Sequence, residues 1–165
     1  MRHKANGHGK FFHTDGDMYE GEWVNDKAEG HGTYQHANGS FYDGHWKEDC
    51  QHGYGQETWI EGSSYEGYYW KGEKYGHGKY IWSDGSTYVG QWEANKVDGQ
   101  GQYSWNDGRI YDGEWKDNKM HGKGVYRWLD GRMYEGSYLH DKKHGQGVYR
   151  WADGRKYDGE WANGK

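Results

Sequence analysis

Paired carboxylates are the residues of this sequence whose type and spacing first suggest chemistry. Glu20 and Glu22 stand two residues apart, and Asp158 and Glu160 repeat the arrangement near the other end. Along a β-strand such residues point to the same side, roughly 7 Å apart, a separation that suits glycoside hydrolysis. The pair recurs along the chain with no pocket implied around it, so we interpret it as a solvated acidic stripe.

Eleven histidines raise the question of a metal site. His8 and His31 occupy the same position of a repeating pattern, as do His121 and His144. Residues at equivalent positions of adjacent hairpins lie about 10 Å apart across two strands, whereas zinc is held at about 2 Å per bond. We therefore interpret the histidines as loop or solvent-facing residues and expect neither a metal nor a cofactor.

Nucleophiles and phosphate-binding motifs give no stronger signal. Cys50 follows Glu48 and Asp49, and a thiolate beside carboxylates is disfavoured. The sequence contains neither a Gly-x-Ser-x-Gly elbow nor a Gly-x-Gly-x-x-Gly loop. We therefore expect no catalytic residues and no enzymatic activity.

A 23-residue repeat is the element that must position these side chains. Each copy begins with a tyrosine, carries a glycine two residues later and a ring two residues after that. The tyrosines are Tyr19, Tyr42, Tyr65, Tyr88, Tyr111, Tyr134 and Tyr157. A Gly-x-Gly pair follows at a fixed distance, and no insertion interrupts the spacing, which indicates a repeat array.

Within each copy the pattern has the two-residue period of a β-strand. Residues 19–23 and 30–36 alternate rings or glycines with polar residues. Asn38-Gly39 and its equivalents predict a tight type I′ turn, and a six-residue loop is expected after Trp23. We predict an all-β fold: an elongated single-layer antiparallel meander of consecutive β-hairpins, with about fourteen strands in a twisted or curved solenoid-like rod.

Glycines share a predicted face with the rings. Because Tyr19, Gly21 and Trp23 are spaced by two, their side chains point the same way. Glycine leaves the main chain bare, so that a ring from the adjoining strand can cover it. We expect the glycines to act as sockets for rings, with each copy relying on its neighbours for cover.

Composition limits the class of protein and of partner. The chain has eleven Trp and seventeen Tyr but ten Val, Ile and Leu together, and a net charge of −5. No apolar run resembles a membrane span or a secretory signal, and the lone Cys50 fits a reducing compartment. We expect a cytoplasmic protein that does not bind nucleic acid, since such binding calls for a basic surface.

The copies that begin at Tyr19 and Tyr111 read Tyr-Glu-Gly-Glu-Trp and Tyr-Asp-Gly-Glu-Trp, the second followed by His-Gly-Lys-Gly. They resemble the MORN repeat (membrane occupation and recognition nexus). The resemblance covers one continuous array of about seven copies, bounded at residues 1–18 (partial), 19–41, 42–64, 65–87, 88–110, 111–133, 134–156 and 157–165 (partial). It implies a non-catalytic protein-interaction scaffold, cytoskeletal or ciliary (axonemal) in setting.

Three residues depart from the family pattern, and both ends lie inside a copy. Tyr69 and Tyr138 replace Trp, and Glu57 stands where other copies carry a ring. Glu57 is expected to loosen the third copy or to mark a site. The first and last residues fall in the expected loop, so uncapped end strands could pair with another sheet edge and give a homo-oligomer.

A second ladder of rings precedes the Asp-Gly turns and forms the predicted partner-binding groove. Exposed Trp and Tyr are favoured anchors for partners, and the alternative is that these rings only pack. A helix or an extended segment of a protein partner is expected to lie along them. The groove residues are Trp59, Tyr80, Trp82, Tyr103, Trp105, Tyr126, Trp128, Tyr149 and Trp151.

Basic residues of the later copies suggest an alternative function. An anionic phospholipid-binding module that tethers the protein to a membrane would use them along one edge. Such a module could be the regulatory part of a phosphatidylinositol phosphate kinase or of another multidomain protein. The alternative reading is solubilising turn residues. The candidates for lipid contact are Arg109, Arg127, Arg132, Arg150, Arg155 and Lys156.

Overall fold

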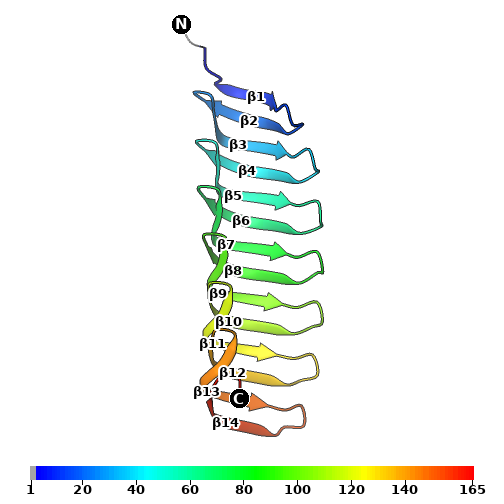
Figure 1. The fold of residues 1–165 in the computed structure, drawn as a ribbon, viewed down its shortest axis with the longest axis vertical. Coiled ribbons are helices and arrows are strands. Elements are labelled where there is room, and N and C mark those ends of the chain that lie inside the picture. Colours follow the sequence, from blue (N-terminus) through cyan, green and yellow to red (C-terminus); the bar gives the residue numbers. More distant parts are fainter. Residues whose placement is uncertain (1–2) are drawn as a thin grey trace. The chain divides into compact units, whose positions relative to one another are not determined.

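The computed structural model describes residues 3–165, which form β-strands joined by turns (Figure 1). Two compact units divide the chain, one ending at Ser83 and one beginning at Asp84. The first contains β1 (Gly7–Phe12), β2 (Met18–Val24), β3 (Lys27–Gln35), β4 (Phe41–Lys47), β5 (Cys50–Thr58), β6 (Ser64–Trp70) and β7 (Glu73–Ile81). The second contains β8 (Thr87–Glu93), β9 (Lys96–Ser104), β10 (Ile110–Lys116), β11 (Lys119–Arg127), β12 (Met133–Leu139), β13 (Lys142–Arg150) and β14 (Lys156–Trp161).

Within each unit the strands pair with their neighbours in chain order, and the pairings are antiparallel. Residues directly opposite each other in such a pair share a face of the sheet. Tyr19 lies opposite Tyr34, and Gly21 lies opposite Gly32. The predicted all-β antiparallel meander of hairpins is therefore confirmed in both units. Residues 3–165 contain no helix long and apolar enough to cross a membrane.

The tight turns lie where the sequence predicted six-residue loops. Asn25 and Asp26 have φ angles of 50° and 69°, the consecutive positive values that define a type I′ turn. Strand β3 already begins at Lys27 and pairs back onto Val24. The predicted loop was wrong because the short polar pair alone closes the hairpin, so residues after it join the ladder.

The predicted type I′ turn at Asn38-Gly39 was also wrong. Gly39 has a φ of 101°, and its N–H donates to the carbonyl of His36 at 3.0 Å. The N–H of His36 donates to the carbonyl of Ser40 at 2.8 Å, which closes a three-residue loop of the type I plus bulge kind. Asn-Gly suits both turns, so the dipeptide alone did not distinguish them.

Two carboxylates of the predicted acidic stripe, Glu22 and Glu114, lie at a bulge of their hairpins. The register between β2 and β3 shifts between Gly21 and Trp23. Glu22 lies at this shift, and its Oε2 accepts the N–H of His31 at 3.3 Å. In the second unit Oε2 of Glu114 accepts the N–H of Lys123 at 2.6 Å. One carboxylate of such a pair therefore accepts a hydrogen bond from a backbone N–H that has no partner in the ladder because of the bulge.

The second residue of each tight turn ties its hairpin to the preceding one. The N–H of Asp49 donates to the carbonyl of Ala28 at 3.1 Å, and Oδ1 of Asp49 accepts the N–H of Ala28 at 2.7 Å. Asn118 and Val97 make the same two bonds at 2.9 and 2.8 Å. Asn and Asp suit this position because they tolerate positive φ and carry an acceptor.

Replacing Asn118 with glycine is expected to lower the free energy of unfolding by about 1–2 kcal/mol, because the buried N–H of Val97 loses its acceptor. Glycine keeps the positive φ of 68° without strain, and Asn118→Asp, which keeps an acceptor, serves as the control. Urea unfolding followed by tryptophan fluorescence measures both variants. A glycine variant as stable as the parent would show that the side chain contributes nothing.

The core is a column of buried tyrosines that lie over bare glycine backbone. Tyr88 and Tyr111 are fully buried. The hydroxyl of Tyr88 donates to the carbonyl of Gln91 at 2.8 Å. A Cβ placed on Gly101 would meet the hydroxyl oxygen of Tyr88 at 2.1 Å. The predicted glycine sockets are therefore confirmed, with the tyrosine of the same hairpin as the ring that fills them.

Rings of the neighbouring hairpins then enclose each tyrosine. Tyr19 meets Trp23 edge-on, with ring centroids 5.0 Å apart, and meets Trp46 of the next hairpin at 5.3 Å. The indole N–H of Trp46 donates to the carbonyl of Gly32 at 3.0 Å. Because a ring of the next copy in the same unit covers tyrosines such as Tyr19 and Tyr111, burial depends on stacking the copies.

Candidate partner-binding site

The predicted groove of the second unit is a ladder of rings in continuous contact. Its tyrosines lie near the ends of β9, β11 and β13. Each tryptophan begins the three-residue loop that follows, which is equivalent to the one at Asn38-Gly39 and is called the wide turn below. Successive ring centroids lie between 4.4 and 5.6 Å apart. The six rings are Tyr103, Trp105, Tyr126, Trp128, Tyr149 and Trp151.

The remaining three groove residues form a shorter ladder in the first unit. Trp59 stacks on Tyr80 with centroids 5.6 Å apart and planes 29° apart, and Tyr80 meets Trp82 at 4.6 Å. Most rings of the two ladders are half-buried, but Tyr126 is buried and Trp151 is exposed. The ladders therefore both pack and present ring surface.

The arginines after the wide turns cover these tryptophans instead of pointing away from the sheet. The guanidinium of Arg109 lies 4.9 Å from the ring centroid of Trp105. Its Nε donates to Asp107 at 2.8 Å, and its Nη1 donates to the hydroxyl of Tyr126 at 3.0 Å. The hydrogen bond from Arg109 lowers the pKa of Asp107 below its usual value. This charge is therefore paired within its own turn.

The other basic candidates fall into two groups. Arg132 and Arg155 repeat the arrangement, with Nε 2.8 Å from Asp130 and Asp153. Arg127, Arg150 and Lys156 are exposed at the ends of β11 and β13 and at the start of β14. Lipid contact through these six residues stays a prediction, and carboxylates already pair three of them.

Two lysines lie inside cages of rings on the same face. The Nζ of Lys143 is 5.5–5.7 Å from the ring centroids of Trp128, Tyr134, Tyr149 and Trp161. Lys74 lies 5.2–5.6 Å from Trp59, Tyr65 and Tyr80. Burial lowers the pKa of both lysines. Such ring faces attract a cation.

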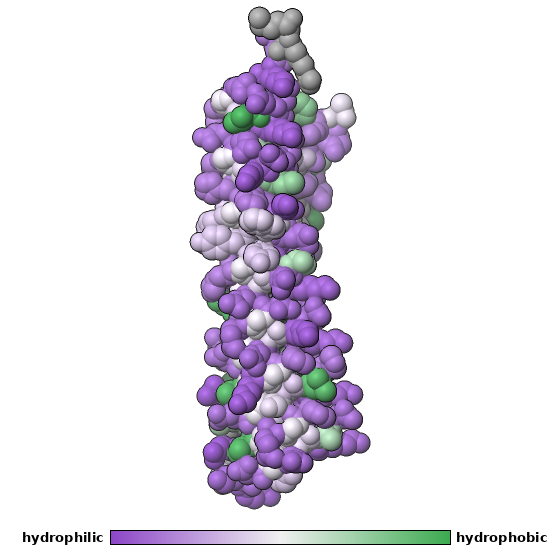
Figure 2. All heavy atoms as spheres, turned by 90° about the vertical axis from the view of Figure 1, so that its left-hand side faces the viewer, coloured by the Kyte–Doolittle hydropathy of each residue, from purple (hydrophilic) through white to green (hydrophobic). Residues whose placement is uncertain are grey.

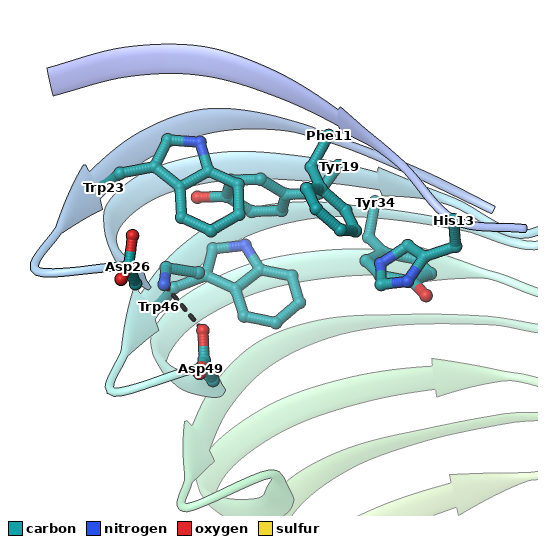
Figure 3. A pocket seen from close by; sticks show the side chains of 9 residues that line it. Phe11, His13, Tyr19, Trp23, Asp26, Tyr34, Trp46 and Asp49 are labelled. Atoms are coloured by element: carbon teal, nitrogen blue, oxygen red, sulfur yellow. Dashed lines mark hydrogen bonds between the residues drawn. The ribbon is translucent and has the colours of Figure 1, made fainter. Parts of the chain in front are cut away.

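A cavity of about 340 Å³ opens at the equivalent position of the first hairpins, where Ala28 is small. Tyr19, Tyr34 and Trp46 line it, together with the carboxylates of Asp26 and Asp49. Figure 3 shows the rings of successive strands facing one another, with both carboxylates at one end. This cavity therefore combines ring surface with negative charge.

The family model of the MORN repeat matches residues 1–18, 19–41, 42–64, 65–87, 88–108, 111–131, 134–154 and 157–165. The chain belongs to the MORN-repeat family. Each match after the first begins at the tyrosine that starts a copy, and all of these tyrosines except Tyr157 are buried in the core. The MORN repeat therefore coincides with the unit that packs. No curated protein matches this MORN array significantly.

Solved structures add a likeness in fold. The TCP domain of SAS-4 (dCPAP) from Drosophila melanogaster, in complex with a proline-rich motif of Ana2, has a TM-score of 0.56 and 13% identity. The match covers 95% of the MORN array and 86% of that domain. The TCP10 domain of Danio rerio CPAP has a TM-score of 0.32 and 12% identity, over 93% and 84% of the two chains. At such identities the first likeness concerns the fold alone.

Two of the three residues that depart from the MORN pattern, Glu57 and Tyr69, form a polar cluster. The hydroxyl of Tyr69 donates to Oε1 of Glu57 at 2.6 Å, and the amide of Gln51 approaches the same oxygen at 3.4 Å. Glu57 also faces Lys74, whose pKa its charge raises against the effect of burial. Two departures that the sequence presents separately thus compensate each other across β5 and β6.

An aromatic patch on another part of the array was missed by the sequence analysis. Tyr54, Tyr68, Trp70 and Tyr75 are each between 42% and 53% exposed, where other MORN repeats carry mainly charged or polar residues. Figure 2 shows a group of pale side chains on one face of the array, among mainly purple ones. A comparison of the residues at equivalent positions of the repeat could have found these four aromatic residues from the sequence. Among residues 3–165, no group of three or more His, Cys, Asp or Glu could hold a metal.

Proposed function

We propose that this MORN array is a non-catalytic protein-interaction module that binds an extended segment of a partner protein along the ring ladder of its second unit. Trp105 and Trp128 support the proposal because they are half-buried within a continuous ladder and keep part of their ring surface accessible. Tryptophan in such a setting is a frequent anchor of binding energy.

The spacing of the ladder favours an extended segment over a helix. Equivalent tryptophans are two strands apart, which corresponds to about 9.6 Å. A polyproline II segment advances about 9.3 Å in three residues, so every third side chain would meet a tryptophan. A helix needs seven residues and about 10.5 Å to return to the same face. The difference between this repeat and the spacing of the tryptophans is larger than for polyproline II, so a helix falls out of register sooner.

The polar groups at the ladder suit the same kind of ligand. A polyproline II segment makes no internal hydrogen bonds, so its carbonyls need donors. The guanidinium groups of Arg109 and Arg132 lie over Trp105 and Trp128 and carry such donors. The similar fold of the SAS-4 TCP domain, solved with a proline-rich motif, also supports this choice. The cytoskeletal or ciliary setting implied by the family resemblance is part of the proposal.

The experiment compares two peptides of equal composition, with proline at every third or at every fourth position. The first is expected to bind the full chain more tightly, measured by calorimetry. Trp105→Ala combined with Trp128→Ala should weaken binding roughly 100-fold, which corresponds to about 1.4 kcal/mol for each tryptophan. Trp70→Ala, which removes an exposed ring of the first unit, is the control and should bind as the parent does.

Two outcomes would overturn this proposal. Equal affinity for both peptides would mean that binding does not depend on a match between the spacing of the prolines and the spacing of the tryptophans. The second outcome has two parts: the parent binds neither peptide, and it binds vesicles containing phosphatidylserine. If the Arg127→Glu, Arg150→Glu variant then loses the vesicle binding, the lipid-binding alternative is favoured. Circular dichroism of the double alanine variant establishes that it remains folded.

A further inference from the structure

One position on the ring face of the repeat carries a different residue in almost every copy. In β3 it is Ala28, which lies directly opposite Trp23, and in β13 it is Lys143, directly opposite Tyr138. The position lies on the ring face of the sheet. The residues along the array are Ala5, Ala28, Gln51, Lys74, Val97, Met120 and Lys143.

Lys143 shows what this position can hold. Its ammonium lies 5.5–5.7 Å from four ring centroids, those of Trp128, Tyr134, Tyr149 and Trp161. The side chain is half-buried, and the loss of water lowers its pKa. Ring faces of this kind attract an ammonium group more strongly when it is partly desolvated, so the cage is a cation site filled by the chain itself.

The same cage recurs around Ala28, with a cavity in place of the lysine side chain. Residues 115 positions earlier in the sequence line it: His13, Tyr19, Tyr34 and Trp46 correspond to Trp128, Tyr134, Tyr149 and Trp161. Ala28 itself is 5% exposed and ends at Cβ. The cavity of about 340 Å³ therefore has three of the four ring types that hold Lys143.

Two carboxylates make the cavity at Ala28 more acidic than the cage of Lys143. Asp26 and Asp49 line it, whereas Asp141 and Gly164 occupy the equivalent positions around Lys143. Oδ1 of Asp49 is fixed by the N–H of Ala28 at 2.7 Å, as the dashed line in Figure 3 marks. Negative charge is therefore held at a fixed place beside the rings, which favours a cation.

We infer that the cavity at Ala28 binds the side chain of a lysine from a partner protein, with its ammonium over Tyr19, Tyr34 and Trp46 and near Asp49. The bound side chain would take the place that Lys143 fills with its own side chain in the equivalent cage of the second unit. The cavity belongs to the first unit and the ladder of the proposed function to the second, so the two experiments succeed or fail separately.

The test uses the full chain and two small probes, N-acetyl-lysine methylamide and the neutral N-acetyl-norleucine methylamide. Nuclear magnetic resonance follows the indole N–H signals of Trp23 and Trp46, which flank the cavity. The lysine probe is expected to give saturable shifts at millimolar concentration. Norleucine, with a side chain of similar length and no charge, should bind at least roughly tenfold more weakly.

Three variants separate the cage from general effects. Ala28→Lys places an internal ammonium in the cavity, as Lys143 does in its own cage, and should abolish the shifts while the protein stays folded. Met120→Lys makes the same change at the equivalent position of the second unit and should leave the shifts intact. Asp49→Asn keeps an acceptor for the N–H of Ala28 and should weaken lysine binding roughly three- to tenfold.

The inference is overturned if norleucine and lysine bind equally, since the cavity would then be an apolar pocket. It is equally overturned if Ala28→Lys binds the lysine probe as the parent does, because the signal would come from elsewhere. If Ala28→Lys fails to fold, Asp49→Asn still tests the inference. An unchanged affinity of Asp49→Asn for the lysine probe would show that the charge of Asp49 does not contribute to binding, and would contradict the inference.

Discussion

Replacing Gly101 with alanine is expected to lower the free energy of unfolding by about 3 kcal/mol or more. The new Cβ would meet the hydroxyl oxygen of Tyr88 at 2.1 Å and its Cζ at 2.3 Å. Tyr88 cannot swing aside, because Trp92 and Trp115 pack against it with centroids 5.3 and 5.8 Å away. Overpacking a ring that has no free space shifts backbone and side chains together.

Gly9→Ala is the matched control, because Gly9 occupies the same position of the repeat without a tyrosine over it. A Cβ there meets only the indole of Trp23, at 3.6 and 3.7 Å, which is ordinary contact. This variant should differ from the parent by about 1 kcal/mol or less. Urea unfolding followed by fluorescence and by circular dichroism measures both proteins. Equal destabilisation by the two substitutions would show that glycine is needed for the backbone and not as a ring socket.

Removing the ring itself is expected to have the second large effect. Tyr111→Ala should cost about 3–5 kcal/mol, as is usual for a large buried ring. Tyr111 is fully buried, packs edge-on against Trp115 at 5.1 Å and against Tyr138 at 5.3 Å, and donates its hydroxyl to the carbonyl of Glu114 at 2.9 Å. All of these contacts disappear together.

Two further substitutions divide this cost into its parts. Tyr111→Phe keeps the ring and loses the hydroxyl bond, so a loss of about 1 kcal/mol is expected. Tyr157→Ala removes the equivalent ring of the last copy, which is 45% exposed, and should cost about 1 kcal/mol. Thermal unfolding followed by circular dichroism measures the series. If Tyr157→Ala destabilised the protein as much as Tyr111→Ala, cover by a following copy would not be what stabilises the column.

The packing and the proposed binding depend on the same face of the sheet. Tyr19 and Tyr34 lie directly opposite each other, and the first is buried whereas the second is half-buried. A sheet with a single layer has no second layer to cover the rings farther from the glycine row. Those rings therefore keep accessible surface, and a bound segment would supply the missing cover.

Much of this arrangement could be predicted from the sequence, because it depends on short spacings. The two-residue alternation around Tyr19, Gly21 and Trp23 gave the strands and their common face. The 23-residue interval gave the antiparallel meander, since each copy must pair with the next. The socket role of glycine followed from the same alternation, and the contact between Gly32 and the ring of Tyr19 confirms it.

The tertiary structure decided whatever depends on contacts between copies. Asn38-Gly39 suits two kinds of turn, and only the hydrogen bonds across it distinguish them. Nothing near Lys143 in the sequence indicates that Trp128 and Trp161 enclose it, nor that Asp49 reaches the cavity at Ala28. Sequence spacing determined which residues repeat and which face they share, because the backbone period acts locally. The pairing of a given charged side chain with a given ring depends on how the hairpins pack, because the two residues belong to different hairpins that come together only when the chain folds.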